Sequence, residues 1–181
     1  MLKNNSSEFA KAIYEKNDFE MAMIAEKLTD PNFTDEKGWT PVIHAGYWGM
    51  TQTVRVLTER GADPDIKTPD GYSALIYAVE SGNIYTVRAL LEAGADPNIT
   101  NGEGWTPLIW ASALGFYNIA AELLKNGADI SIRNDQEMTA LDIARLGHQE
   151  HIESLLENHI LQQENLLPIG AADCPVNSME L

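Results

Sequence analysis

Apolar residues occur along the chain in short clusters, and these clusters return at a fixed spacing. The segment at 38–63, with the sequence GWTPVIHAGYWGMTQTVRVLTERGAD, comes back at 71–96 and at 104–129, each time 33 residues later. A looser copy begins at Glu137, and an Asp-Pro step at Asp30 extends the period toward the N-terminus. Self-similarity at a period of roughly 20–50 residues is typical of a stacked array. The sequence therefore predicts about five structural units, each in contact mainly with its neighbours.

Each unit is expected to contain two short helices. Thr or Ser followed by Pro or Ala begins the first helix, as at Thr106-Pro107, because the hydroxyl caps the helix and proline is tolerated at its first position. Glycine ends both helices, at Gly115 and Gly127 in this unit. A polar run of Asp, Pro, Asn and Gly follows, which predicts turns rather than a third helix. Since neither helix is long enough to be stable alone, the units must pack against one another.

Alanine recurs on the first helix of successive units, at Ala45, Ala78, Ala111 and Ala144. A side chain this small lets the helices of the next unit approach closely. We therefore expect leucine at one of these positions to overpack the array and to cost roughly 1–3 kcal/mol of stability.

These anchors, written G-x-T-P-L-x-x-A-x-x-x-G and L-L-x-x-G-A-D-x-N, recur in register in three full copies. In this respect the chain resembles the ankyrin-repeat family over about residues 4–160. The resemblance implies an all-α ankyrin-repeat solenoid of stacked helix-turn-helix units, from which β-hairpin-like turns project along one edge. The family often has histidine two residues after the proline, and this chain has Ile43, Ile76, Ile109 and Asp142 there. Apolar packing is therefore expected to replace a polar link between units.

The period divides the repeat domain at 4–160 into units at 4–34, 35–67, 68–100, 101–133 and 134–160. The first and last units lack several anchors and carry polar residues, which fits capping units whose outer faces are in water. The last helix is expected to continue toward Leu167 and to stop at Pro168. The C-terminal extension at 161–181 becomes small and polar there, and we expect disorder after residue 168.

Composition narrows the class of partner. The chain has 12 Lys and Arg against 27 Asp and Glu, a formal net charge of −15. Such a surface repels phosphates and anionic lipid headgroups, so nucleic acid and membranes are not expected partners. The single cysteine, Cys174, allows no disulfide within the chain, and neither a signal peptide nor a membrane-spanning run is evident. We expect a monomer in the cytoplasm, or one delivered into a host cytosol.

The candidate binding residues are mainly aromatic. The residue before the helix cap is Trp39, Tyr72 or Trp105 in three successive units. The resemblance places this position at the base of the hairpin, on the concave face where partners bind. The end of the first helix lines the same face and supplies Tyr47 and Trp48. Exposed aromatic residues of this kind are typical of interaction hot spots.

Further candidates surround these rings. Leu114 and Glu80 stand at the ends of first helices, and the hairpin tips add Glu36, Asp70 and Glu103. Together they suggest an apolar groove with an acidic rim. The competing interpretation is that the rings only pack between hairpins and stiffen the array. It applies least to Trp48, which has no aromatic equivalent in the other units, whereas Tyr77 and Trp110, within first helices, are expected to pack in the core or between units.

No catalytic motif is found, because the chain has no phosphate-binding glycine loop and no G-x-S-x-G, and its glycines have cap or turn roles. His148 and His151 are spaced for one helical face, with Glu150 and Glu153 nearby, but no third metal ligand is apparent. We therefore expect no catalytic, cofactor or metal site. An enzyme would require a metal at this histidine pair.

The sequence thus favours a non-enzymatic interaction module that binds a protein or peptide with a basic or amphipathic segment. Its apolar side would meet the rings, and its cations would meet the acidic rim and the tryptophan faces. Two alternatives remain open. One is an acidic regulatory or inhibitory subunit that blocks a basic surface by charge mimicry, with an affinity that collapses in salt. The other is an effector protein delivered into another cell.

Overall fold

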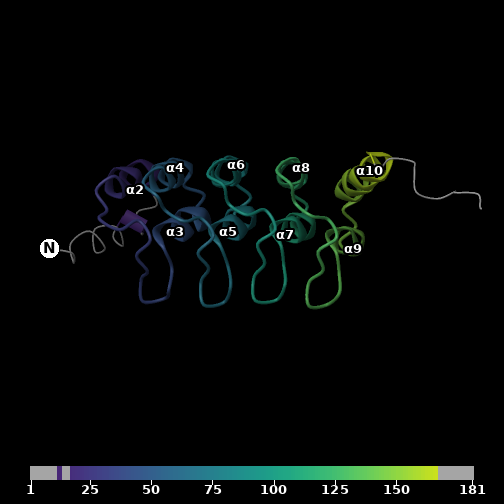
Figure 1. Cartoon of the computed structure of the whole chain (residues 1–181), viewed down its shortest axis with the longest axis horizontal. Helices are drawn as coiled ribbons and strands as arrows, with labels where there is room; N and C mark the ends of the chain where they lie inside the picture. Colours follow the sequence, from purple (N-terminus) through teal and green to yellow (C-terminus); the bar gives the residue numbers. More distant parts are fainter. Residues whose placement is uncertain (1–11, 14–16, 167–181) are drawn as a thin grey trace, which may run out of the picture.

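Two rows of short helices run side by side in the computed structural model, which describes residues 12–13 and 17–166 (Figure 1). The inner row contains α3 (Pro41–Tyr47), α5 (Ala74–Glu80), α7 (Pro107–Leu114) and α9 (Ala140–Leu146). The outer row contains α2 (Asp18–Ala25), α4 (Thr51–Glu59), α6 (Ile84–Glu92), α8 (Tyr117–Lys125) and α10 (Glu150–Leu166). Each inner helix contacts the next inner helix, and each outer helix contacts the next outer helix. The helix pairs therefore form a solenoid, as the sequence predicts.

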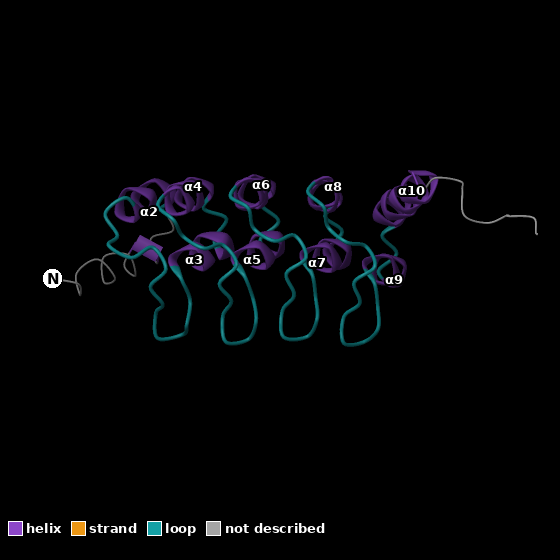
Figure 2. Cartoon of the chain, viewed as in Figure 1, coloured by secondary structure: helices purple, strands orange, loops and turns teal. Residues whose placement is uncertain are grey.

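The segments that project from the inner row are loops, and no described residue forms a β-strand (Figure 2). Two backbone hydrogen bonds close each loop. In one of them the N–H of Thr68 donates to the carbonyl of Tyr72 at 2.8 Å, and the N–H of Gly71 donates to the carbonyl of Thr68 at 2.8 Å. Gly71 has a φ of 84°, which glycine adopts without strain. The predicted all-α class with hairpin-like turns is confirmed.

The inner helices begin where the sequence predicts. The Oγ1 of Thr106 accepts a hydrogen bond from the N–H of Ile109 at 3.2 Å, and the Oγ of Ser73 accepts one from Ile76 at 3.3 Å. Both hydroxyl residues are almost fully buried. Each cap satisfies a backbone N–H group that would otherwise have no partner in the helix.

The recurring small and branched residues form the continuous core. Ala45, Ala78, Ala111 and Ala144 are all 0% exposed. Ile43, Ile76 and Ile109 are buried as well, so apolar packing replaces the polar link at these positions. The expectation is wrong at Asp142. Its carboxylate accepts hydrogen bonds from the N–H and hydroxyl of Thr139 at 2.9 and 2.7 Å, because it caps its own helix instead of packing between units.

The last helix, α10, runs to Leu166, in agreement with its expected extension. The expected disorder after residue 168 concerns residues outside the described range. None of the described helices combines the length and apolar character needed to cross a bilayer.

Candidate partner-binding surface

Aromatic side chains from three successive units touch one another in one continuous group. We call this group the aromatic array; it contains Trp39, Tyr47, Trp48, Tyr72, Tyr77, Trp105 and Trp110. At one end, the ring centroids of Trp105 and Trp110 are 4.9 Å apart. Trp110 lies 6.3 Å from Tyr72, which stacks on Tyr77 at 5.1 Å. The loop residue of one unit is thus linked to that of the next through a ring on the inner helix.

The other end of the aromatic array lies at α3. The ring of Tyr77 is 4.8 Å from Trp39 and 5.5 Å from Tyr47. Tyr47 packs edge to face on Trp48, with centroids 4.8 Å apart and an interplanar angle of 82°. Tyr77 is therefore the central ring of the array. The sequence predicts only packing roles for Tyr77 and Trp110, although they follow His44 by one and two periods of 33 residues and are therefore equivalent positions.

The rings of the aromatic array differ in how far they are exposed to solvent. Tyr47 and Trp48 are 41% and 37% exposed. Trp39 and Trp105, by contrast, are partly buried and pack against the hydrophobic core. Packing against the core therefore explains much of the burial of the rings at the loop bases. It accounts less well for the Tyr47–Trp48 end, where two large rings remain in contact with solvent.

Two leucines are exposed at the ends of inner helices in the C-terminal units. Leu114, at the end of α7, is 40% exposed, and Leu146, at the end of α9, is 74% exposed. Leu114 is among the residues predicted from the sequence, whereas Leu146 is not. The signal was available, because Leu146 stands 33 residues after Ala113 and thus in the register of Tyr47.

The four predicted acidic site residues are all exposed, and none forms an ion pair with a described residue; they are Glu36, Asp70, Glu80 and Glu103. We call them the acidic rim. Acidic residues of the outer helices behave differently. Glu92 pairs with Arg55 at 3.0 Å, and Glu122 pairs with Arg88 at 2.8 Å. These two outer-row carboxylates are therefore neutralised by a neighbouring arginine, and those of the acidic rim are not.

The electrostatic field of the acidic rim reaches the rings. Burial, together with the negative charges of Glu80 and Asp70, raises the pKa of Tyr77 to about 12. A phenol in this environment stays neutral, since its ionisation would add a negative charge beside existing ones. The same field favours a cation at the surface of the array.

The polar contact behind Trp39 joins an acid and an imidazole, whereas at the equivalent positions of the next unit Tyr77 hydrogen-bonds to the side chain of Thr68. The Nε2 of His44 lies 3.0 Å from the Oδ2 of Asp35, and the His44 ring is 5.0 Å from Trp39. Burial lowers the pKa of His44, while the hydrogen bond to Asp35 opposes that shift. At the equivalent positions of a later unit, Asn101 and Trp110, the buried Nδ2 and Nε1 have no hydrogen-bond partner. The first pair therefore fixes the ring beside it more firmly.

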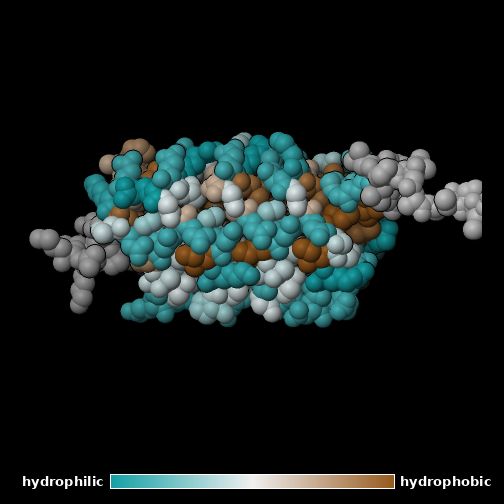
Figure 3. Space-filling view, viewed as in Figure 1, coloured by the Kyte–Doolittle hydropathy of each residue, from teal (hydrophilic) through white to brown (hydrophobic). Residues whose placement is uncertain are grey.

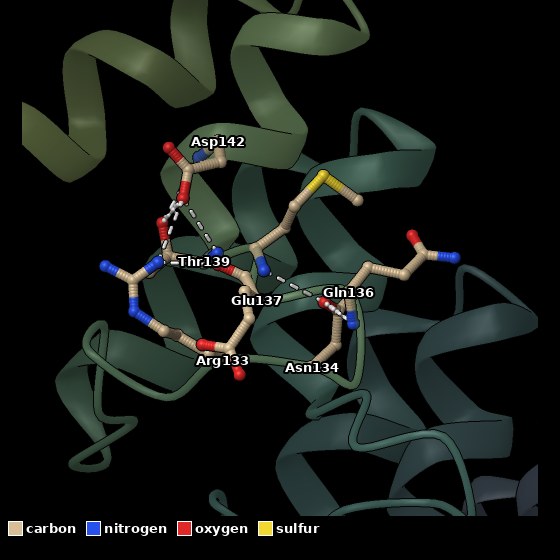
Figure 4. A network of polar contacts seen from close by, with 7 residues as sticks. Arg133, Asn134, Gln136, Glu137, Thr139 and Asp142 are labelled. Atoms are coloured by element: carbon tan, nitrogen blue, oxygen red, sulfur yellow. Dashed lines mark hydrogen bonds and ion pairs between the residues drawn. The ribbon is translucent and has the colours of Figure 1, made fainter.

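The aromatic array does not continue into the last loop, where Met138 replaces the ring and a polar network is found (Figure 4). The Oδ1 of Asn134 accepts hydrogen bonds from the N–H groups of Gln136 and Met138, both at 3.0 Å. The guanidinium of Arg133 donates to the carbonyl of Glu137 at 2.6 Å. Figure 3 shows one face of the molecule, on which the loop tips are hydrophilic and hydrophobic residues gather in separate spots nearer the helices and beside α10.

The histidine pair considered as a metal site lies outside this surface. His148 has a φ of 53° just before α10, and His151 lines an open groove with Tyr117 and Leu155. In the part of the chain that the structure describes, no three His, Cys, Asp or Glu side chains form a group that could hold a metal ion.

The chain matches a known protein family. A family model described as ankyrin repeats, with three copies, matches residues 2–101 and residues 86–165. Together these matches cover most of the chain. No curated protein matches it.

Proposed function

Because the chain belongs to the ankyrin-repeat family, whose repeats generally mediate protein–protein interaction, we propose that it binds a protein partner through the aromatic array and the acidic rim. The observation that carries this proposal is the exposed Tyr47–Trp48 end of the array beside carboxylates without ion pairs. Large aromatic residues dominate the energy of many interfaces when a partner removes them from water.

The chemistry of the partner follows from the charges. A segment with apolar residues would cover the rings and Leu114, while its cations would approach Asp70, Glu80 and Glu103 from solvent. Charge complementarity of this kind accelerates encounter and excludes acidic competitors. The partner that fits is therefore a protein with a basic, amphipathic segment.

The rings are positioned for binding before a partner arrives. Tyr47 contacts three other rings of the array, including Trp39 at 5.5 Å and Tyr77 at the same distance. Side chains that are already fixed lose little conformational entropy when they are covered. Proteins of this family are typically non-enzymatic interaction modules, and the proposed binding requires no reactive group on this surface.

The test is capture of a partner from native extract with the intact protein and two variants. In Trp48→Ala the exposed end of the array is shortened. In the matched control, Tyr85→Ala, an aromatic residue that is 66% exposed on the outer helix α6 is removed. We expect the intact protein and Tyr85→Ala to retain the same partner equally, and Trp48→Ala to lose it. The helicity of both variants should be unchanged.

The salt dependence separates this function from charge mimicry. A partner held through the rings should remain bound in moderate salt, because apolar burial is not screened. A partner that both variants hold equally and that salt releases would contradict the proposal. That result would favour an acidic regulatory or inhibitory subunit that blocks a basic surface.

A further inference from the structure

We propose that the exposed end of the aromatic array recognises an arginine side chain of the partner. The recognition site, called the arginine subsite, consists of Tyr47, Trp48, Tyr77 and Glu80. This inference rests on the proposed function and names the residue that the most exposed part of the surface would bind.

The rings of the arginine subsite are held by one another. Tyr47 meets Trp48 at 82° and Tyr77 at 83°, so its neighbours both contact it edge to face. This packing is a favourable arrangement of aromatic pairs, and it fixes the ring planes. Tyr47 and Trp48 remain 41% and 37% exposed, and aromatic rings of this kind attract a cation that approaches them from solvent.

The carboxylate of the subsite comes from the neighbouring unit. Glu80 is the last residue of α5, and it is exposed and makes no ion pair with a described residue. Its charge contributes to the raised pKa of Tyr77, whose ring contacts Tyr47. Glu80 also follows Tyr77 by three residues on α5, so the two side chains lie on one face of that helix, and both favour a positive charge there.

Arginine fits this combination better than lysine. A guanidinium is planar and weakly hydrated, so it can stack on an aromatic face while its edge donates two hydrogen bonds to a carboxylate. An ammonium is compact and strongly hydrated, and it satisfies only one of these demands well. The subsite should therefore distinguish the two cations even though their charges are equal.

The arginines of the chain have hydrogen-bond partners outside the subsite. Each arginine donates a hydrogen bond elsewhere; the five are Arg55, Arg60, Arg88, Arg133 and Arg145. The subsite also occurs once along the inner row. The residues equivalent to Glu80 are Tyr47, Ala113 and Leu146, so a single carboxylate sets the register in which a partner docks.

The experiment compares two capped peptides of equal charge that differ at three positions only, where one has arginine and the other has lysine. The dissociation constants are measured at physiological salt by titration, and the indole N–H signal of Trp48 is followed by NMR. We expect the arginine peptide to bind at least about five-fold more tightly and to shift the Trp48 signal.

Two variants assign the preference to the subsite. Glu80→Gln and Trp48→Leu should each bring the two peptides to within about two-fold of one another. The control Glu59→Gln, which removes the same charge from an exposed residue at the end of α4, should keep the preference. Since Glu80 is exposed, its variant should fold normally, and melting curves verify this for each protein.

Two results would overturn the inference. One is equal affinity of the intact protein for both peptides, and the other is a preference that survives in Glu80→Gln. Neither result affects the proposed function, which depends on loss of the captured partner in Trp48→Ala. Conversely, an arginine preference together with a partner that Trp48→Ala still retains would support the subsite and contradict the proposed function.

Discussion

At the scale of single residues, one position ties each of the first three units to the unit that follows it. In Asn32 and Asn98 the side-chain amide both donates a hydrogen bond and accepts one. The Nδ2 of Asn98 donates to the carbonyl of Gly127 at 3.2 Å, and its Oδ1 accepts from the N–H of Asp129 at 2.7 Å. The equivalent Asp65 accepts from the N–H of Asp96 at 3.0 Å but, as a carboxylate, has no N–H to donate. The link at Asp65 is therefore weaker.

Replacing Asp65 by asparagine should stabilise the protein by about 1 kcal/mol at pH 7, because the amide restores a donor toward the next unit. Burial raises the pKa of Asp65, and the carboxylates of Asp96 and Asp63 add to this shift. The charged form of Asp65 therefore lowers the stability of the folded protein at a pH above this raised pKa. The loss of stability disappears as the pH falls below the pKa and the carboxylate is protonated. Urea unfolding at neutral and acidic pH should show a gain in Asp65→Asn that shrinks on acidification.

The control for this prediction is Asp129→Asn. Hydrogen bonds from the hydroxyl and the N–H of Ser131 lower the pKa of Asp129, so its charge contributes stability that is lost as pH falls. Asp129→Asn should therefore be no more stable than the wild type at pH 7. A stabilisation equal to that of Asp65→Asn would mean that reduced net charge, rather than the hydrogen bond, causes the effect.

The last loop has a residue with a side chain where the other loops have glycine. Glu137 has a φ of 60°, whereas Gly38, Gly71 and Gly104 occupy the same place in the other loops. A residue with a side chain pays about 1 kcal/mol or more for this conformation. Glu137→Gly should raise the free energy of unfolding by about 0.5–1 kcal/mol, with part of the gain lost to the greater freedom of the unfolded chain. A lower melting temperature in Glu137→Gly would contradict this reasoning.

At the scale of helices, α4 depends on another helix for its start. Its N-cap residue, Met50, has no capping side chain. The carboxylate of Asp18, in α2, instead accepts hydrogen bonds from the N–H groups of Gln52 and Thr53 at 2.9 and 2.8 Å. The cap therefore also holds the N-terminal helix against the next unit.

Asp18→Ala should cost about 1–2 kcal/mol, the usual effect of losing an N-cap, and should speed amide exchange in both α2 and α4. The control is Glu20→Ala, which removes an exposed acidic residue from the same helix. Equal destabilisation in the two variants would mean that charge in the first turn of α2 matters rather than the cap on α4.

Helices with local start signals were predictable, and contacts between units were not. Thr106 and Ser73 are followed directly by the segments that they cap, so the sequence alone locates these helix starts. Nothing in the sequence joins Asp18 to Thr53, because that contact depends on how two helices pack. For the same reason the 33-residue ladder of rings was visible, but the bridging role of Tyr77 and the exposure of Leu146 required the tertiary structure.

At the scale of the whole molecule, stability depends on close packing between neighbouring inner helices. Ala78 is fully buried in α5, which contacts both α3 and α7. Ala78→Leu should therefore lower the free energy of unfolding by roughly 1–3 kcal/mol through overpacking. Ala113→Leu, at a partly exposed position of α7, serves as the control and should have a smaller effect in urea unfolding. Equal stability of Ala78→Leu and the wild type would show that the stack tolerates wider spacing.

The central claim is that the exposed end of the aromatic array contributes binding energy. The most direct measurement is the dissociation constant of the captured, purified partner for the wild type, Trp48→Ala and Tyr85→Ala in moderate salt. We predict a loss of at least about tenfold in Trp48→Ala, as for an aromatic hot spot, and no loss in Tyr85→Ala. Equal affinity of all three folded proteins would contradict the account and leave the rings a packing role only.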